Sequence, residues 1–222
     1  MADASDFQWL TSKEAVLLRP DALLGSNDPV DDTAELLGPD GAAPRRFSLS
    51  RIFMNLVGEL LVNALDAAVN DEGVRRIKIS FKDGVLEVFN DGKGIPVTLF
   101  GDTGRYLPEI IFTELNAGSN FQDKGKRFSG GRNGVGASCA NMWASAFSVD
   151  IHDAERGLRY EQEFSENMSR VGAPVIKKCS GKNGHVRVLF KPDYERLGIL
   201  DHEDSLLTDL VRTRAGDGAL CA

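Results

Sequence analysis

Five polar side chains recur at helical spacing within an otherwise apolar stretch. Asn55, Glu59, Asn63, Asp66 and Asn70 are separated by four, four, three and four residues, which places them on one stripe of a helix. The exposed face of an ordinary amphipathic helix carries lysines and arginines, whereas this stripe carries only carboxylates and carboxamides. Such oxygen donors suit a hard cation and a positioned water molecule. The stripe is therefore a candidate site.

A second candidate is the glycine-rich segment Ser129-Gly-Gly-Arg-Asn-Gly-Val-Gly136, which leads directly into an expected helix at 137–146. Glycines just before a helix let backbone N–H groups converge on an anion at the positive helix end. The segment thus predicts a phosphate cradle over Gly131–Gly136. It has neither the Gly-Lys-Ser/Thr of a P-loop nor the glycine pattern of a dinucleotide fold, and a glycine-rich turn alone is more often structural.

Several elements have to position these two segments. Helices are expected at 51–70, 106–115, 137–146 and 204–214, and strands at 77–81, 85–89, 147–151, 158–164 and 185–190. The turn Asp83-Gly84 joins the first two strands into a hairpin, which delivers the segment Asn90-Asp-Gly-Lys-Gly-Ile-Pro96. Ahead of the core, which begins near Phe47, Leu10 to Leu24 form a short semi-apolar arm. Asp28 to Arg46, rich in Pro, Gly and Asp, are expected to form a surface excursion.

Bulk properties narrow the classes of protein. A chain of 222 residues with 42% hydrophobic content can bury one sizeable core, so one domain is expected. The net charge of −7 argues against nucleic-acid binding by this segment alone, because neutralising phosphates requires a surface rich in lysine and arginine. Three widely spaced cysteines indicate reduced, intracellular thiols, the N-terminus lacks the pattern of a secretory signal, and no apolar run is expected to reach membrane-spanning length.

The order of these motifs resembles the gyrase, chaperone, histidine kinase and MutL superfamily of ATPases. The acid-and-amide helix comes first, then the strand with Asn90 to Pro96, then Ser119-Asn120 and Gly130-Gly-Arg-Asn-Gly134. Within that superfamily, Leu17-Leu-Arg-Pro-Asp21 and Phe190-Lys-Pro-Asp193 resemble the ATPase region of type II DNA topoisomerases, most closely their eukaryotic and large-virus branch. The resemblance runs from about Phe7 to Arg214.

The resemblance implies an α+β fold, a two-layer sandwich of a mixed β-sheet covered by helices. It implies an N-terminal arm at 1–27 and an ATP-binding domain at 28–222, with the transducer and DNA-cleavage domains of the family absent from this chain. The implied function is that of an ATP-binding and hydrolysing module, which uses ATP and Mg²⁺ to close a dimeric gate while the topoisomerase passes one DNA duplex through another. Because the family's phosphate-sensing transducer lysine is missing, slow hydrolysis is expected.

On the long helix, Glu59 lies where the family has the general base that deprotonates the water attacking the γ-phosphate. Asn63 matches the family's protein ligand to Mg²⁺, a neutral oxygen that leaves most of the coordination to water and phosphates. Asp66 is expected to orient that water or Asn63. The alternative for Asp66 is an ordinary exposed carboxylate.

Around the nucleotide, Asn90 matches the position that reads the adenine amino group, and Gly94 and Ile95 pass close to the base. Ser119 and Asn120 match polar contacts to ribose and phosphates. The charged segment Phe121–Phe128 is expected to act as a lid, and the alternative is an ordinary solvated loop. The run that matches the family's phosphate-binding segment comprises Gly131, Arg132, Asn133, Gly134, Val135, Gly136, Ala137 and Ser138.

Three positions depart from the family's pattern. Phe7 replaces the tyrosine that reaches into the partner protomer's nucleotide site, which puts cross-protomer ATP contact in doubt. Ser138 stands where the eukaryotic branch has lysine. Val186 stands where a threonine joins the water network at the adenine, so base recognition is expected to be looser.

The partners implied by the family are DNA, through domains missing from this chain, and a second copy in the whole enzyme. The isolated chain is expected to be a monomer, with no membrane partner. We expect a piece of a longer protein, the alternative being a naturally short one. Nucleus, viral factory and bacterial cytoplasm all suit such an acidic ATPase. Two rival functions are a stand-alone nucleotide switch, as in mismatch repair or chaperones, and a dead dimerisation domain, which the intact Glu59 and Asn63 oppose.

Overall fold

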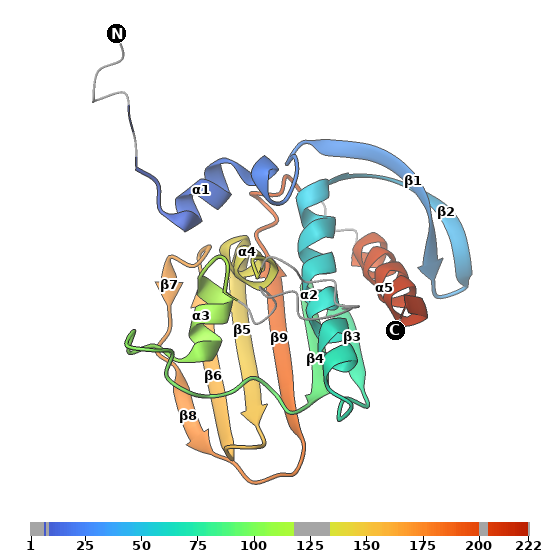
Figure 1. The fold of residues 1–222 in the computed structure, drawn as a ribbon. Helices are drawn as coiled ribbons and strands as arrows, with labels where there is room; N and C mark the ends of the chain where they lie inside the picture. The colour runs from blue at the N-terminus through green and yellow to red at the C-terminus, as the bar shows by residue number, and fades with distance from the viewer. Residues whose placement is uncertain (1–6, 8, 118–133, 200–203, 222) are drawn as a thin grey trace, which may run out of the picture.

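The protein folds into two layers, one sheet and one set of helices (Figure 1). The computed structural model describes residues 7, 9–117, 134–199 and 204–221. Helices α2 (Arg51–Asn70), α3 (Leu107–Thr113) and α4 (Gly136–Met142) lie across one face of a seven-stranded sheet. This is the two-layer α+β arrangement expected from the sequence.

The strands of the main sheet follow the order β3-β4-β9-β5-β6-β7, with β8 also paired to β6. Their bounds are β3 Ile77–Lys82, β4 Val85–Gly92, β5 Ala144–Asp153, β6 Leu158–Ser165, β7 Arg170–Val171, β8 Val175–Lys178 and β9 Gly184–Pro192. Every pair described is antiparallel, so the expectation of a mixed sheet is wrong in this respect. The hairpin of β3 and β4 is confirmed. Asp83 and Gly84 have φ values of 52° and 70°, the consecutive left-handed pair of a type I′ turn.

Helix α2 forms the centre of the core. Ser50 caps its start, since the Ser50 hydroxyl accepts a hydrogen bond from the Ile52 N–H at 3.2 Å. The side that faces the sheet and α4 is buried and apolar, through Ile52, Phe53, Leu56, Val57, Leu60, Leu61 and Ala64. By length and composition alone α2 could cross a membrane, contrary to the sequence-based expectation. Here, however, its apolar residues belong to the core cluster, which accounts for its hydropathy.

The surface excursion expected at 28–46 is a β-hairpin. Strands β1 (Pro29–Gly38) and β2 (Gly41–Ser50) pair over ten residues each. Most of their side chains are exposed, so the alternation of polar and apolar residues that marks a half-buried strand is weak. The hairpin packs against α5 (Asp204–Cys221), where the Leu37 N–H donates to the Thr213 hydroxyl at 2.8 Å. Buried Asp209 of α5 accepts from Arg212 at 2.8 Å.

Two helical boundaries differ from the sequence-based expectation by more than two residues. Helix α4 ends at Met142 rather than at 146, because Ala144 and the residues after it enter β5 and pair with β9. Helix α5 continues to Cys221, seven residues beyond the predicted end at 214. In both cases the choice depends on tertiary contacts that local composition does not encode.

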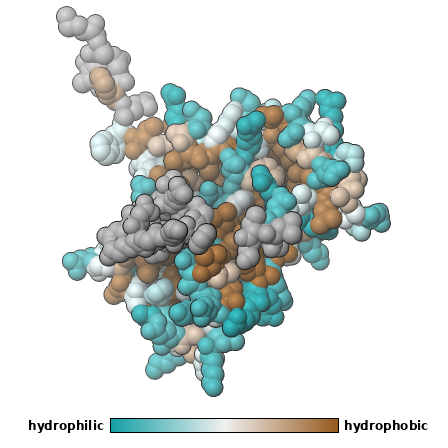
Figure 2. All heavy atoms as spheres, turned by 45° about the vertical axis from the view of Figure 1, so that its right-hand side comes forward, coloured by the Kyte–Doolittle hydropathy of each residue, from teal (hydrophilic) through white to brown (hydrophobic). Residues whose placement is uncertain are grey.

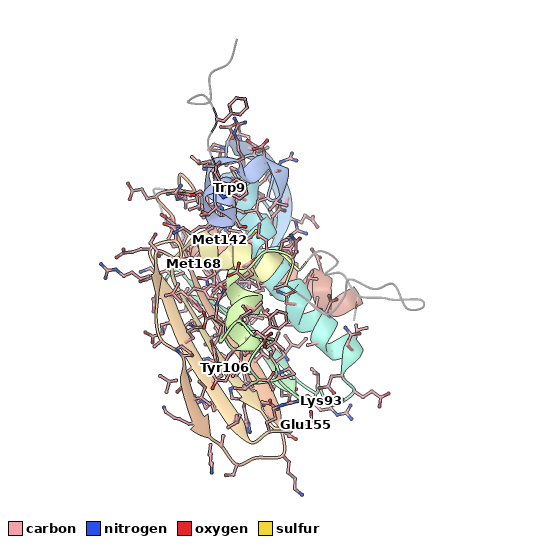
Figure 3. The ribbon with its side chains drawn as sticks, turned by 60° about the vertical axis from the view of Figure 1, so that its left-hand side comes forward. Trp9, Lys93, Tyr106, Met142, Glu155 and Met168 are labelled. Atoms are coloured by element: carbon pink, nitrogen blue, oxygen red, sulfur yellow. The ribbon has the colours of Figure 1, made fainter. Side chains whose placement is uncertain are left out.

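The arm and the segment after β4 lie at opposite ends of the molecule. Within the arm, α1 (Ser12–Leu18) begins with a capping box between Thr11 and Glu14, and a short 3₁₀ turn follows at Pro20–Ala22. Trp9, just before α1, is 96% exposed. Figure 3 shows Trp9 beyond one end of the sheet, whereas Lys93 and Glu155 lie at the other. In Figure 2 hydrophobic residues gather across the middle of the helix-covered side, and hydrophilic residues line its lower edge.

Candidate functional site

Two of the five polar residues of the stripe on α2, Asn55 and Asn70, use their side chains in hydrogen bonds to backbone carbonyls. The Asn55 side-chain amide donates to the Leu24 carbonyl at 2.7 Å and so anchors the arm to the core. The Asn70 amide donates to the Asp66 carbonyl one turn earlier, also at 2.7 Å. Glu59 and Asp66 are half-buried, and Asn63 is exposed on the same face. The remaining three residues, Glu59, Asn63 and Asp66, are therefore the candidates for binding or catalysis on this helix.

Glu59 lies against the start of α4 rather than in open solvent. Burial raises the pKa of its carboxyl, and the nearby charge of Asp66 raises it further. Beneath it, the fully buried thiol of Cys139 has its pKa raised to about 12, by burial first and by the charge of Glu59 second. A carboxylate with a raised pKa in a partly dry setting is suited to accept a proton.

Asn90 lies near the end of β4 and is 6% exposed. Its side-chain amide donates to the Asp91 carbonyl at 3.0 Å. Its neighbour on β9 is Val186, which pairs with Asn90 on one side and with Ile151 of β5 on the other. Asn90, which is expected to read the base, and Val186, which stands where the family has threonine, therefore lie side by side on neighbouring strands.

Two carboxylates that the sequence did not reveal as site residues hold the segment after β4, and a third, Asp91, holds the segment before β3. Asp71, the C-cap of α2, accepts from the Lys93 N–H at 2.7 Å and from the Gly73 N–H at 2.9 Å. Asp153, buried in β5, accepts from the Val97 N–H at 2.8 Å. Asp91 accepts from the N–H groups of Arg75 and Arg76 at 2.7 and 2.8 Å.

These hydrogen bonds keep the pKa of Asp71 below its usual range, the Gly73 and Lys93 N–H groups being the main causes. The hydrogen bond between Asp71 and the Gly73 N–H could have been predicted from the sequence, because an Asp two residues before a Gly at a helix end favours an Asx turn. The segment Gly92–Val97 is therefore fastened at both ends, to α2 and to β5.

Gly94 has to be glycine for two reasons. Its φ is 79°, in the left-handed region. A Cβ at this position would lie 2.2 Å from the carbonyl oxygen of His152, at the end of β5. Gly94 is half-buried, as is Ile95, which packs at the edge of the core cluster. The backbone thus passes directly over the end of the sheet, at the His152 carbonyl.

The start of α4 brings part of the predicted cradle against α2. Gly134 has a φ of 58°, and Gly136, Ala137 and Ser138 are buried. The Ser138 hydroxyl donates to the Val135 carbonyl at 3.0 Å, so it is engaged with its own turn. Five predicted site residues lie outside the described residues, as does the proposed lid at 121–128: Ser119, Asn120, Gly131, Arg132 and Asn133.

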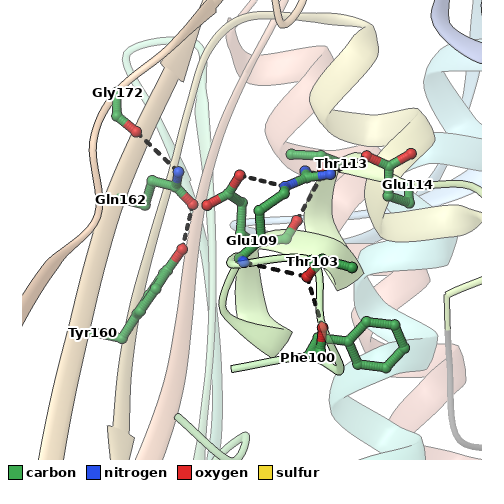
Figure 4. A network of polar contacts seen from close by, with 9 residues as sticks. Phe100, Thr103, Glu109, Thr113, Glu114, Tyr160, Gln162 and Gly172 are labelled. Atoms are coloured by element: carbon green, nitrogen blue, oxygen red, sulfur yellow. Dashed lines mark hydrogen bonds and ion pairs between the residues drawn. The ribbon is translucent and has the colours of Figure 1, made fainter. Parts of the chain in front are cut away.

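Helix α3 is held by a polar network that the sequence did not reveal (Figure 4). The Arg105 guanidinium donates to the Glu109 and Glu114 carboxylates at 2.7 and 2.6 Å, and to the Thr113 hydroxyl at 2.5 Å. Asn141 of α4 donates from its amide to the Phe112 carbonyl at 2.9 Å. These contacts stabilise α3 and tie it to α4, the two helices that precede and follow residues 118–133 in the chain.

The donor set on α2 fits a magnesium ion that is held mainly by water and phosphate. Within the described residues, no group of three or more His, Cys, Asp or Glu side chains could enclose a metal. Asn63 contributes an exposed carboxamide oxygen, one turn from Glu59. Mg²⁺ commonly takes one or two protein ligands together with substrate phosphates, so Asn63 suits that arrangement.

A separate cavity of about 710 Å³ opens between the arm and the end of β9. It is lined by Leu17, Leu18, Pro20, Asn27, Trp143, Asp193, Glu195 and Arg196. Its lining includes none of the predicted site residues that the structure describes.

Comparisons with known proteins agree with this geometry. The family model for histidine kinase-, DNA gyrase B- and HSP90-like ATPases matches residues 49–166. DNA topoisomerase 2 of Arabidopsis thaliana is 32% identical over 97% of the chain, and the chain spans 15% of that relative's length. The sequence similarity covers both the arm and the sheet.

Two solved structures are similar in fold. The ATPase and transducer domains of DNA topoisomerase II from Balamuthia mandrillaris match with a TM-score of 0.90 at 33% identity, over 99% of this chain and 58% of that one. The ATPase region of Saccharomyces cerevisiae topoisomerase II matches with a TM-score of 0.88 at 30% identity, over 95% and 57%. These matches confirm the expected resemblance and fold class.

The close approach at Gly94 predicts a large, local sensitivity to substitution. We expect Gly94→Ala to reduce the free energy of unfolding by at least about 2 kcal/mol more than Gly101→Ala, because only the first adds a backbone clash to the cost of positive φ. Gly101 has a φ of 51° with nothing within 4 Å of an added Cβ, so it isolates the conformational cost. Urea unfolding of both variants measures the difference. Equal losses would show that the contact with His152 does not constrain this segment.

The raised pKa of Glu59 predicts a pH-dependent gain from removing its charge. The folded state binds this proton more tightly than the unfolded chain, so stability falls as pH rises from the usual carboxyl pKa through the raised value. We expect Glu59→Gln to raise Tm by about 2 °C near pH 7.5, a small gain because the side chain is only partly buried. The gain should vanish below about pH 4.

The control for this experiment is Glu72→Gln, an exposed carboxyl just beyond α2, which should leave Tm nearly unchanged at both pH values. Thermal unfolding followed by circular dichroism gives all the values required. A lower Tm for Glu59→Gln near neutral pH would mean that the Glu59 charge stabilises the fold. That result would contradict a partly buried carboxyl whose pKa is raised.

Proposed function

The chain belongs to the histidine kinase-, DNA gyrase B- and HSP90-like ATPases, and we propose that it is the ATP-binding and hydrolysing module of a type II DNA topoisomerase. The observation that carries the proposal is the contact between α2 and α4. It places a partly buried carboxylate, Glu59, beside the glycine-rich start of a helix. A proton acceptor next to a phosphate cradle is the arrangement that phosphoryl transfer to water needs.

In this proposal Glu59 orients the attacking water and takes its proton on a carboxylate oxygen. The raised pKa strengthens Glu59 as a base, yet leaves it ionised above that pKa. Asn63 would hold Mg²⁺ through its carboxamide oxygen, and Asp66 would orient water around it. When bound, Mg²⁺ neutralises charge on the phosphates. Backbone N–H groups from Gly134 onward would bind phosphate oxygens beside it.

The other side of the nucleotide would rest on β4 and the segment after it. Asn90 would read the adenine amino group, and Gly94 with Ile95 would cover the ring. The rigid fastening of Lys93 and Val97 supports this role, because a preorganised wall loses little entropy when it binds a ring. We propose that Ser119 and Asn120 contact the ribose and phosphates, and that Gly131, Arg132 and Asn133 bind the phosphates.

The chain spans about 15% of the length of the topoisomerase 2 relatives and rather more than half of the solved regions it matches. We propose that DNA is the substrate of the whole enzyme, bound through other domains, and that ATP closes two copies of this module into a gate inside the cell. The exposed Phe7 and Trp9 of the arm suit a contact with a second copy. The relatives favour this proposal over a stand-alone nucleotide switch.

Calorimetry with a non-hydrolysable ATP analogue and Mg²⁺ tests the binding roles. We expect Asn63→Ala to weaken binding about tenfold, and Glu59→Ala to bind within about threefold of wild type. Asn70→Ala is the matched control, since Asn70 lies on the same helix face and bonds only within its own turn. Without Mg²⁺ the Asn63→Ala effect should disappear. If it persists, Asn63 acts without a metal.

Steady-state hydrolysis by the same proteins tests the chemical role. Glu59→Ala should lower kcat by at least about a hundredfold, the usual contribution of a general base. Hydrolysis at the wild-type rate in that variant would remove Glu59 from the mechanism. No analogue binding by any of the proteins would refute the nucleotide function itself.

A further inference from the structure

Gly136, the first residue of α4, is buried and has no conformational need to be glycine. The glycines with left-handed φ include Gly134 and Gly94, but Gly136 is not among them. An alanine could therefore adopt its backbone geometry. The reason for glycine has to be space.

That space is occupied by Glu59. A Cβ at position 136 would lie 2.0 Å from Oε2 of Glu59, 2.7 Å from its Cδ and 2.8 Å from its Cβ. All three of the nearest atoms belong to this one side chain. Ordinary carbon contacts need about 3.5 Å or more. The carboxylate of Glu59 thus lies where the first side-chain carbon of any other residue would be.

We infer that Gly136 is a positioning residue for hydrolysis: by lacking a side chain, it leaves the space in which the Glu59 carboxylate is held against α4. The inference rests on the proposed function, since it assigns a partner to the proposed base. A methyl group at 136 would push the carboxylate away from α4, because the missing Cβ points at Glu59 of α2.

The surroundings of Glu59 leave the carboxylate little room for another position on this side. Leu56 and Leu60 of α2 are buried in the core, and the fully buried Cys139 of α4 is close enough for the Glu59 charge to raise the pKa of its thiol. A displaced carboxylate therefore has to turn away from the core and toward solvent. The general base would then be misplaced, and misplacement by about 1 Å can lower a rate by about a hundredfold.

A loss of kcat without a loss of nucleotide affinity distinguishes this role from a direct phosphate contact. Gly136→Ala should lower kcat for ATP hydrolysis by about a hundredfold. Because alanine keeps the backbone N–H that we propose binds phosphate, KM and the affinity for the non-hydrolysable analogue should stay within about threefold of wild type. If Gly136 instead serves only to let backbone approach phosphate, Gly136→Ala should lose affinity, and that result would overturn the inference.

Gly58→Ala is the matched control. Gly58 is the residue before Glu59 on α2, and nothing lies within 4 Å of an added Cβ there. Alanine is the better helix former, so this variant should keep full hydrolysis and gain slightly in Tm. Loss of hydrolysis in both variants would show that any methyl group near Glu59 is harmful, and would also overturn the specific role of Gly136.

Thermal unfolding supplies a readout that does not depend on nucleotide. Gly136→Ala should lower Tm in the wild-type background and lower it by less than half as much in the Glu59→Ala background, where the clashing Cδ and Oε2 are gone. Equal losses in both backgrounds would contradict the contact. This comparison remains decisive even where Gly136→Ala is too unstable for kinetics.

The pH dependence of the residual rate is the final discriminator. In wild type the acidic limb of kcat should follow the raised pKa of Glu59. In Gly136→Ala the displaced carboxylate is better solvated, so that limb should move to lower pH. An unmoved limb would indicate a merely structural effect. Wild-type protein without hydrolysis, or active Glu59→Gln, would instead refute the proposed function.

Discussion

Helix α2 has to pack into the core along one side and carry oxygen donors along the other, and the arrangement of the site follows from this double requirement. Its apolar side is almost inaccessible to solvent, from Ile52 to Ala64. A helix fixed so firmly cannot move its polar stripe away from α4. Glu59 is consequently held in a partly dry position, where ionisation costs free energy and the pKa rises.

The segment after β4, which we propose faces the adenine base, depends on a different kind of contact: its backbone N–H groups donate to carboxylates. Asp71 ties the segment after β4 to the end of α2, and Asp153 ties it to β5. Gly94 then lets that segment lie directly on the sheet end. The segment is thereby fixed near both ends by hydrogen bonds. These two carboxylates act in the fold, and we propose that the chemistry falls to Glu59 and Asn63.

Much of this could be predicted from the sequence, and the exceptions share a physical cause. Helix 51–70 and the β3–β4 hairpin were predicted because their periodicity and turn chemistry are local. The hairpin β1–β2 was not, since its exposed strands lack alternation and pair only with each other. Asn55 was grouped with the chemical residues, yet it bonds to Leu24, far away in sequence. The contact of Glu59 with Gly136 likewise needed the folded chain.

We propose that nucleotide lies between α2, the segment after β4 and the start of α4. This location can be tested by backbone amide NMR during titration with a non-hydrolysable ATP analogue and Mg²⁺. We expect the largest chemical-shift changes at Asn90–Ile95 and Gly134–Ser138, with little change around the cavity lined by Leu17 and Trp143. Large shifts at that cavity, with none at Asn90–Ile95, would contradict it.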